Sequence, residues 1–324
     1  MGIRQLNTYL LKQCSNSSIR NIHLSELRNK KVSVDISIYL YNFESRGNLI
    51  NGIYEMINVF KFYGIIPVFI FDGKPPDEKK YIIQERKKKK ENNKEKIKEL
   101  NSKLDNLNNL NNDIALEEKK NILYNIEKLE RQTIFITREK IEQVKNIIRI
   151  SGATYYDAPQ EADELCSILA IREQVWACIS EDMDIFIYGC PRIIRYLNIF
   201  NKTAKLYNLE NILYDLNISF NNFKQICILS GTDYNSFNNK YDLLKSIRLY
   251  NDYIEYMNIH KIENSYTKLE FIQWIITYID SSLNYELLLK IYDMFELNNQ
   301  NKLRQFKNIL IMTNDYNYNY NYNY

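Results

Sequence analysis

Three short apolar runs decide the fold: KVSVDIS at residues 31–37, IIPVFIF at 65–71 and QVWACIS at 174–180. Each run is rich in β-branched side chains and almost continuously apolar, which is typical of strands buried on both faces of a parallel sheet. Apolar residues at three- and four-residue spacing predict a helix between the first two runs: Leu49, Ile53, Ile57 and Phe60. Another helix is predicted at 138–150. This order of strands and helices predicts an α/β fold with a central, mostly parallel sheet and helices on both faces.

The segment 77–135 differs from its surroundings because it is highly charged and rich in asparagine. It carries two thin apolar stripes, Leu100–Leu104–Leu107 and Ile122–Ile126–Leu129, with a polar break at 108–113. This pattern predicts an antiparallel helical hairpin that projects from the sheet. The alternative is a solvated, charged insertion without a function.

From residue 220 onward the apolar periodicity is helical, with helices predicted near 219–230, 240–257, 265–280, 284–296 and 299–312. The chain ends in an Asn/Tyr repeat, which predicts disorder. We therefore divide the chain into an N-terminal part of the α/β domain (1–76), the hairpin (77–135), an internal part of the same domain (136–235), a helical C-terminal region (236–312) and a disordered tail (313–324).

The composition is that of a soluble protein, with 45% hydrophobic and 26% charged residues. No apolar run approaches the ~20 residues that span a bilayer, and the N-terminus lacks the layout of a secretion signal. Five cysteines without a C-x-x-C pair indicate buried, reduced thiols of an intracellular protein: Cys14, Cys166, Cys178, Cys190 and Cys227. With only two histidines, a histidine zinc site or a Ser-His-Asp triad is disfavoured, and the chemistry falls to carboxylates, lysines and arginines.

The net charge of +3 is unevenly spread. Residues 74–103 carry 12 Lys/Arg against 6 Asp/Glu, so this segment is +6 and the rest of the chain is −3. A local basic stretch beside a mildly acidic body suits a protein that attracts polyanions at one place.

Carboxylates stand where an α/β sheet keeps its ligands, at the carboxyl ends of strands and the starts of the following helices. They are Asp35, Asp72, Glu161, Asp163, Asp182, Asp184 and Asp233. Any one of them could simply cap a helix. Two carboxylates ~5 Å apart repel by roughly 3 kcal/mol at an effective dielectric of ~20, so such a cluster requires cations. Hard divalent ions such as Mg²⁺ take oxygen ligands and suit phosphodiester hydrolysis.

Six motifs around these acids occur in a fixed order: MGIRQL at the N-terminus, VDISIYLY, FDGKPP, DAPQEAD, SEDMDIFIYG and LSGTDY. Together they resemble the flap endonucleases of the XPG-type family of structure-specific 5′ nucleases, from residue 1 to about 235. The resemblance implies the PIN-like 5′ nuclease fold. It also implies that the seven acids bind two Mg²⁺ ions, with Mn²⁺ as an alternative ion.

The resemblance implies roles for basic and aromatic residues as well. Lys79 and Arg86 would reach the scissile phosphate, and their seven-residue separation places them on one helix face. The hairpin then corresponds to a helical arch for a single-stranded 5′ end. Gly2 would pack near the active site, and Tyr41 would stack on a base, with a core position as its equal alternative. The remaining DNA-binding candidates are lysines: Lys87, Lys88, Lys89, Lys90, Lys240 and Lys245.

Three features depart from the family pattern. Asp163 stands where many relatives have Glu, and helix geometry alone would pair Glu161 with Glu164 instead. Relatives follow their last Asp with a glycine-containing helix-hairpin-helix turn that binds duplex backbone and potassium, whereas residues 235–247 (NSFNNKYDLLKSI) contain no glycine. The spacing of Gln300, Leu303 and Phe306 resembles a sliding-clamp-binding peptide, but Lys307 replaces the second aromatic, which favours an ordinary amphipathic helix.

The implied activity is that of a flap endonuclease and 5′→3′ exonuclease in DNA replication, repair or recombination, acting on DNA with a 5′ flap, nick or free 5′ end. A PIN-like ribonuclease is one alternative, against which the basic hairpin and FDGKPP count. A non-catalytic DNA-binding homologue is another, against which the complete set of acids counts. We expect a monomer without a membrane segment, located in the nucleus of a eukaryote or at the cytoplasmic replication site of a virus.

Overall fold

The computed structural model describes residues 2–107, 113–235, 240–261, 268–297, 306–307 and 309–310. The chain forms two compact units. The first comprises Met1–Ile36, Ile57–Lys74 and Ala153–Tyr324, and the second comprises Ser37–Met56 and Pro75–Gly152. Within the described ranges, no helix combines the length and the apolar character that crossing a bilayer requires.

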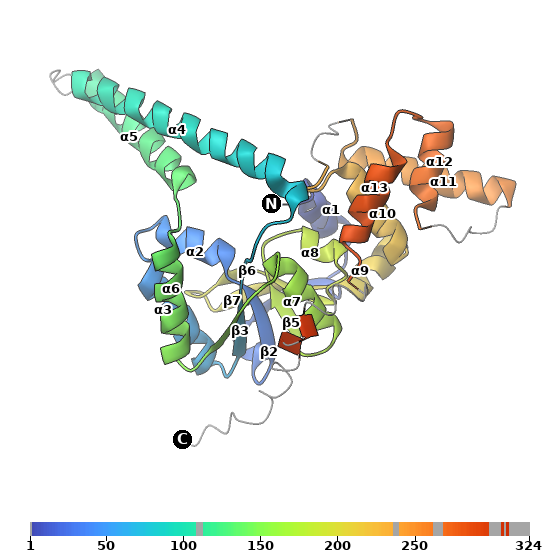
Figure 1. Ribbon diagram of the computed structural model, residues 1–324, viewed down its shortest axis with the longest axis horizontal. Coiled ribbons are helices and arrows are strands. Elements are labelled where there is room, and N and C mark those ends of the chain that lie inside the picture. The colour runs from blue at the N-terminus through green and yellow to red at the C-terminus, as the bar shows by residue number, and fades with distance from the viewer. Residues whose placement is uncertain are drawn as a thin grey trace. The chain divides into compact units, whose positions relative to one another are not determined.

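The first unit contains a seven-stranded sheet of order β1-β7-β6-β5-β2-β3-β4 (Figure 1). The strands are β1 Ile19–His23, β2 Lys31–Asp35, β3 Ile66–Phe71, β4 Thr154–Asp157, β5 Ala177–Ile179, β6 Arg192–Asn198 and β7 Thr203–Asn208. The five strands from β6 to β4 are parallel to one another, whereas β7 is antiparallel to both β6 and β1. The predicted α/β fold with a mostly parallel sheet is therefore confirmed.

Each of the three apolar runs contains one observed strand, namely β2, β3 or β5. Four strands were not predicted. β4 (TYYD) is short and lies at the edge of the sheet, and its last residue is exposed. β1, β6 and β7 mix buried with exposed or half-buried side chains, and only β6 resembles an apolar run at its start. β1 and β4 are the edge strands, and β6 and β7 lie between β1 and the central strands with part of their side chains exposed, so the apolar signal of these four strands is weak.

Helices of the first unit pack against the sheet and against each other. They are α1 Leu6–Gln13, η1 Leu24–Leu27, α7 Ala162–Ile171, α8 Asp184–Ile187, α9 Leu209–Leu216, α10 Phe220–Ser230, α11 Leu243–His260, α12 Glu270–Tyr278 and α13 Tyr285–Met294. α7 contacts β2, β3 and β5, and α10 contacts α11, α12 and α13. The helices predicted near 219–230, 240–257, 265–280 and 284–296 are thus confirmed, with shifted ends. Most of the helix predicted at 299–312 and all of the tail at 313–324 lie outside the described residues.

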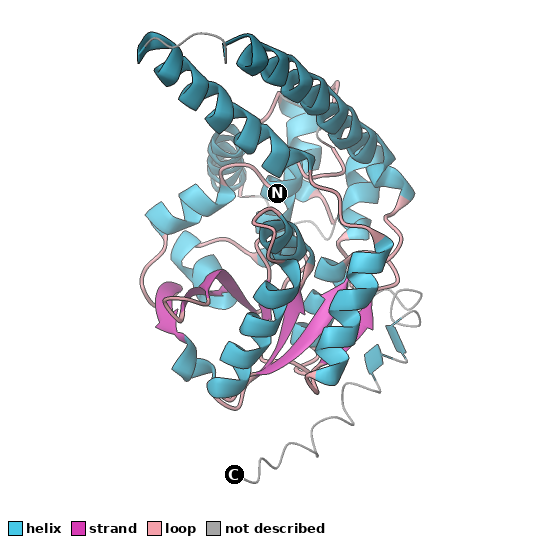
Figure 2. Cartoon of the chain, turned by 90° about the vertical axis from the view of Figure 1, so that its left-hand side faces the viewer, coloured by secondary structure: helices cyan, strands magenta, loops and turns pink. Residues whose placement is uncertain are grey.

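The second unit is helical, with α2 Ser37–Glu44, the first part of α3 Leu49–Phe62, η2 Asp77–Lys79, α4 Lys80–Leu107, α5 Asp113–Thr133 and α6 Arg138–Ile150. α4 and α5 lie side by side over most of their length (Figure 2). Asn93 contacts Gln132 and Lys90 contacts Ile134, so the two helices are antiparallel. The predicted hairpin is confirmed. An ion pair between Lys140 and Glu44 joins α6 to α2.

Candidate active site

The strand order creates a switch point at β2. From β2 the chain continues to β3 and then β4 on one side, and it later returns to β5 on the other side of β2. At such a point the connections leave in opposite directions, which opens a crevice outside the carboxyl ends of the strands. Asp35 is the last residue of β2, and Ser180 directly follows β5.

Ser180 joins two of the predicted acids. Its hydroxyl oxygen lies 3.1 Å from Asp35 Oδ2 and 3.0 Å from Asp163 Oδ1. The same oxygen accepts a hydrogen bond of 3.1 Å from the backbone amide of Asp182. A serine hydroxyl has one proton, so it can donate to only one of the two carboxylates at a time. The other carboxylate must find a different partner.

The acids after β3 and β4 are held together by backbone contacts. The Ala162 amide donates a 2.9 Å hydrogen bond to Asp72 Oδ1, and this amide lies between Glu161 and Asp163 in the chain. Glu161 is the N-cap of α7, and Asp163 lies in the first turn of that helix. Gly73 makes the approach possible, since a Cβ there would lie 1.9 Å from the carbonyl oxygen of Ala158. The glycine of the FDG motif therefore brings Asp72 to the start of α7.

Tyr234 links the loop after α10 to the same place. Its hydroxyl donates a 2.6 Å hydrogen bond to Glu161 Oε2, and Asp233 precedes it in the chain. Burial raises the pKa of Tyr234, and the nearby Glu161 carboxylate raises it further. The loop is fixed by Asn235, whose side chain accepts from the Thr232 amide at 2.6 Å and donates to the Ile228 carbonyl at 2.6 Å.

Asp182 and Asp184 lie beside the N-terminus. The Asp184 amide donates to Asp182 Oδ1 at 3.1 Å, and a Cβ at Gly2 would meet Asp182 Oδ1 at 2.3 Å. The buried Arg195 holds the loop that carries Glu181 and Asp182. It donates a 2.9 Å hydrogen bond to the Glu181 carbonyl and pairs with the Glu181 carboxylate at 3.4 Å.

The electrostatics of this cluster call for cations. Asp163 is half-buried. Desolvation by the surrounding protein raises the pKa of its carboxyl well above the ordinary value. The charges of Asp35 and Asp182 add to this rise. Among the residues with described positions, no three His, Cys, Asp or Glu side chains converge at direct coordination distance. Mg²⁺ keeps several waters and needs only one or two direct carboxylates, so this all-oxygen set fits such ions.

The choice between Asp163 and Glu164 depends on the direction of each side chain. Asp163 shares Ser180 with Asp35. Glu164 is only 3% exposed, and the three contacts of the Ser180 hydroxyl described above do not include it. Through Ser180, Asp163 is joined to Asp35.

The predicted basic residues of the arch belong to the second unit. Lys79 ends η2, and Arg86 lies in the second turn of α4, which continues directly from η2. The side chains of Lys87, Lys88 and Lys89 are exposed. Tyr41 and Lys90 contact each other, with the Lys90 ammonium 5.3 Å from the centroid of the Tyr41 ring. Tyr41 is 45% exposed, which argues against its alternative as a core residue.

Lys240 and Lys245 lie at the described end of the glycine-free turn. The Lys240 ammonium and the Tyr241 hydroxyl both donate to Asp280 Oδ2, at 2.6 Å and 2.7 Å. Lys245 donates to the Lys240 carbonyl at 3.2 Å and lies 4.7 Å from the centroid of the Tyr241 ring. Both lysines keep exposed side chains. Side-chain contacts thus organise this end of the turn.

The clamp-like spacing receives no support from burial. Gln300 and Leu303 lie outside the described residues, whereas Phe306 is 1% exposed and belongs to the hydrophobic core. A clamp peptide needs its aromatic anchor exposed, so the burial of Phe306 favours the amphipathic-helix interpretation.

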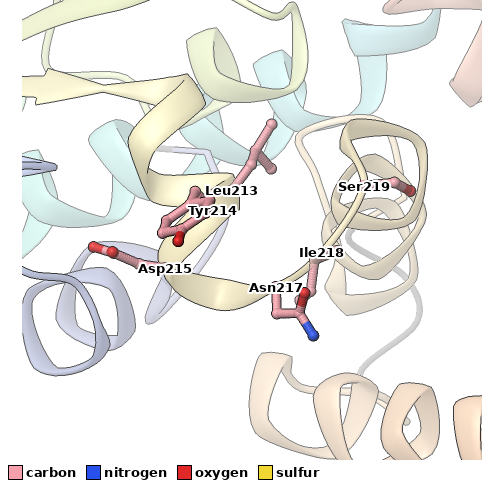
Figure 3. A pocket seen from close by; sticks show the side chains of 6 residues that line it. All are labelled: Leu213, Tyr214, Asp215, Asn217, Ile218 and Ser219. Atoms are coloured by element: carbon pink, nitrogen blue, oxygen red, sulfur yellow. The ribbon is translucent and has the colours of Figure 1, made fainter.

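An open pocket of about 610 Å³ lies at the end of α9 (Figure 3). Its lining includes Tyr214, Asp215 and Asn217 but none of the seven acids. Asp215 already accepts hydrogen bonds from Ser15 and Ser18, which hold the pKa of its carboxyl below the usual value. The pocket therefore offers no acid cluster and is distinct from the site at the switch point.

Comparisons with known proteins identify the family of this chain. A family model of the XPG N-terminal domain matches residues 1–93, and a model of the XPG I-region matches residues 152–233. The chain belongs to the XPG family. Five of the seven acids fall inside one of these two matches between residues 152 and 233, and Asp35 and Asp72 fall inside the other.

Two XPG relatives are similar along most of this chain. Flap endonuclease 1 of Zea mays is 29% identical over 254 residues, covering 72% of this chain and 62% of the relative. Flap endonuclease 1 of Komagataella phaffii is 31% identical over 255 residues, covering 72% and 63%. The chain therefore spans about three fifths of the length of these relatives. The catalytic core of Rad2 in complex with DNA substrate has a TM-score of 0.61 at 20% identity, covering 92% of this chain and 87% of that one, which shows a shared fold.

Two residues at the XPG site were not predicted from the sequence. Ser180 stands directly before the SEDMD acids and Tyr234 directly after Asp233, so both lay inside motifs already quoted. The sequence signal for both residues is that each stands next to an acid at the end of a strand or helix. Spacing alone does not show that Ser180 contacts two carboxylates or that Tyr234 orients Glu161.

Proposed function

We propose that this protein is a structure-specific 5′ nuclease that hydrolyses DNA phosphodiester bonds at 5′ flaps, nicks and free 5′ ends. The observation that carries the proposal is the Ser180 bridge, which joins Asp35 on β2 to Asp163 on α7 at the switch point of the sheet. Two carboxylates of different elements share one hydroxyl there, and the backbone amide of Asp182 donates to the same oxygen. The names of the relatives and the DNA substrate in the Rad2 complex support a DNA nuclease.

We assign metal binding to the seven acids: Asp35, Asp72, Glu161, Asp163, Asp182, Asp184 and Asp233. When bound, two Mg²⁺ or Mn²⁺ ions would lower the pKa of an attacking water and neutralise the departing oxygen. The chain supplies the orientation. Tyr234 fixes one oxygen of Glu161, the Ala162 amide fixes one oxygen of Asp72, and Arg195 fixes the loop that carries Asp182. Outer contacts of this kind set the geometry of metal ligands.

The arch supplies the groups for the phosphate. Arg86 offers a planar fork to two phosphate oxygens, and Lys79 offers a point charge. The exposed Lys87, Lys88 and Lys89 extend a basic path that attracts a nucleic-acid backbone without reading its sequence. A single-stranded 5′ end is the polyanion that such a path fits best.

One assay set tests the proposal. A labelled 5′-flap DNA, a matched single-stranded RNA and a nicked duplex are each incubated with Mg²⁺ or with EDTA. We expect cleavage of both DNA substrates in Mg²⁺ and none in EDTA. Asp182→Ala should remove cleavage and leave DNA binding measurable, whereas Asp252→Ala, which changes an exposed acid of α11, serves as the matched control.

The outcomes separate the alternatives. Binding without cleavage by the unmodified protein would contradict an enzyme and favour a DNA-binding homologue. Faster cleavage of the plain RNA would favour a ribonuclease of the PIN-like type. Cleavage by Asp182→Ala at the rate of Asp252→Ala would show that the acids are wrongly assigned.

A further inference from the structure

The four consecutive lysines at the base of the arch are of two kinds. Lys87, Lys88 and Lys89 have exposed side chains, whereas Lys90 is half-buried. The Lys90 ammonium donates a 2.8 Å hydrogen bond to the carbonyl oxygen of Ile134 and lies 5.3 Å from the centroid of the Tyr41 ring. Lys90 thereby joins three segments of the second unit: α4, the segment after α5, and α2.

Lys90 marks the place where α4 loses its partner helix. One turn further along α4, Asn93 is 6% exposed and donates to Gln132 at 3.2 Å, close to the end of α5 at Thr133. A polar pair in such a seam fixes its register. Beyond it, Ile97 and Leu100 begin the apolar seam. Residues 80–89, which carry Arg86, therefore precede the paired part of the hairpin, and Lys90 closes its near end.

The Lys90 ammonium makes two described contacts within the protein. An ammonium has three N–H donors, and here one carbonyl oxygen and one ring face are within reach. Burial lowers the pKa of Lys90, and the charge of Lys94 lowers it further. A phosphate oxygen would be a stronger acceptor for this group than either present partner. Tyr41 is 45% exposed, and an exposed aromatic ring is a surface on which a base can stack.

We propose that Lys90 is a positioning residue that caps the Tyr41 ring in the free protein and is displaced when a nucleotide base stacks on that ring. The ammonium then turns from the ring to the backbone phosphate of the same nucleotide. Because Lys90 also holds Ile134, its displacement loosens the near end of the hairpin and couples base stacking to the position of Arg86. The inference rests on the proposed function, since it requires a nucleic-acid end at Tyr41.

The test uses the 324-residue chain and a 5′-flap DNA with 2-aminopurine at the flap base nearest the duplex, whose fluorescence falls when it stacks on an aromatic ring. In EDTA no cleavage is expected, so quenching reports stacking alone. Lys90→Met keeps the aliphatic length and removes the cap, and Lys88→Met makes the same charge change at an exposed neighbour. Tyr41→Leu removes the ring and gives the baseline. Lys90→Arg restores the cap.

We expect Lys90→Met to reach half-maximal quenching at a protein concentration at least threefold below that of Lys88→Met. In Mg²⁺ we expect its single-turnover cleavage to be at least tenfold slower, because the ammonium that turns to the backbone phosphate is missing. Lys90→Arg should return both values towards those of the unmodified protein. Opposite changes in stacking and cleavage distinguish a cap from a purely structural contact, which would weaken both together.

Two results would overturn the inference: quenching by Lys90→Met that follows Lys88→Met, or quenching by none of the proteins. If Lys90→Met fails to fold, as judged by circular dichroism, Lys90→Gln is measured instead under the same criteria. Failure of the proposed function looks different, because the unmodified protein would then not cut this DNA in Mg²⁺ even though the stacking difference remained.

Discussion

Replacing Gly2 by Ala tests whether the N-terminus shapes the acid cluster. Gly2 has a φ of +75°, and an added Cβ would lie 2.3 Å from Asp182 Oδ1 and 2.6 Å from Asp184 Oδ1. A carbon and an oxygen cannot approach so closely, so the Asp182 carboxylate must move by roughly 1 Å to reach ordinary contact distance. A misplacement of ~1 Å in a reacting constellation costs about 100-fold in rate. We therefore expect cleavage by Gly2→Ala to slow by about two orders of magnitude.

A matched control separates this displacement from backbone strain. Gly152 has a φ of +70°, and a Cβ there would meet nothing within 4 Å. A left-handed conformation costs a non-glycine residue about 1–2 kcal/mol, so Gly2→Ala and Gly152→Ala should lose similar stability through the backbone. Only Gly2→Ala should lose activity and need more Mg²⁺.

The measurement combines urea unfolding with single-turnover cleavage of a 5′-flap DNA over a Mg²⁺ titration. If both variants cut at the same rate and with the same Mg²⁺ dependence, the contact between Gly2 and the acids has no role in the chemistry. If Gly2→Ala is far less stable than Gly152→Ala, the loss of rate would reflect unfolding, and the reasoning from displacement would fail.

Three further predictions follow from the arch and from the turn after Asp233. Lys79→Ala should slow single-turnover cleavage more than it weakens DNA binding, whereas Lys80→Ala, at a side chain 70% exposed, should affect chiefly binding; equal effects would contradict the role of Lys79. Exchange of potassium for sodium should leave the cleavage rate unchanged, since residues 235–247 contain no glycine, and a strong potassium dependence would contradict this. The hydrogen bond from Lys240 lowers the pKa of Asp280, with Ser282 and Tyr241 adding to it. The stability gap between the unmodified protein and Asp280→Asn in urea unfolding should therefore be full above the ordinary carboxyl pKa of ~4 and shrink as the pH falls below it; a constant gap would contradict the ion pair.

The sheet could be predicted where its strands are buried on both faces. β2, β3 and β5 lie at its centre and give continuous apolar runs, so the sequence pattern identifies them. β1 and β7 at one margin and β4 at the other have an exposed edge or face, and their side chains are mixed. Strand order is a separate matter. The return of the chain to the far side of β2 depends on long-range pairing, which no local pattern encodes.

The candidate acids could be predicted because each stands at a strand end or a helix start, which is a local property. Their contacts could not. Ser180 is an ordinary serine in the sequence, and its bridge depends on β2, β5 and the start of α7 meeting at one point. Lys90 looks like its three neighbours in the lysine run, and only the helical phase of α4 against α5 turns it inward. The sequence pattern identifies the acidic residues, whereas the packing of the elements decides which residues they contact.

Two separate sets of contacts fix the two described ends of the segment after Asp233. Its beginning is fixed by Asn235 contacts to Thr232 and Ile228, and these place Tyr234 against Glu161. Its described end is fixed separately by Lys240 and Tyr241 on Asp280. The acid cluster therefore depends on the first set of contacts and not on the second. The absence of glycine from residues 235–247 is therefore compatible with the observed orientation of Glu161, because no hydrogen bond of the second set involves an acid of the cluster.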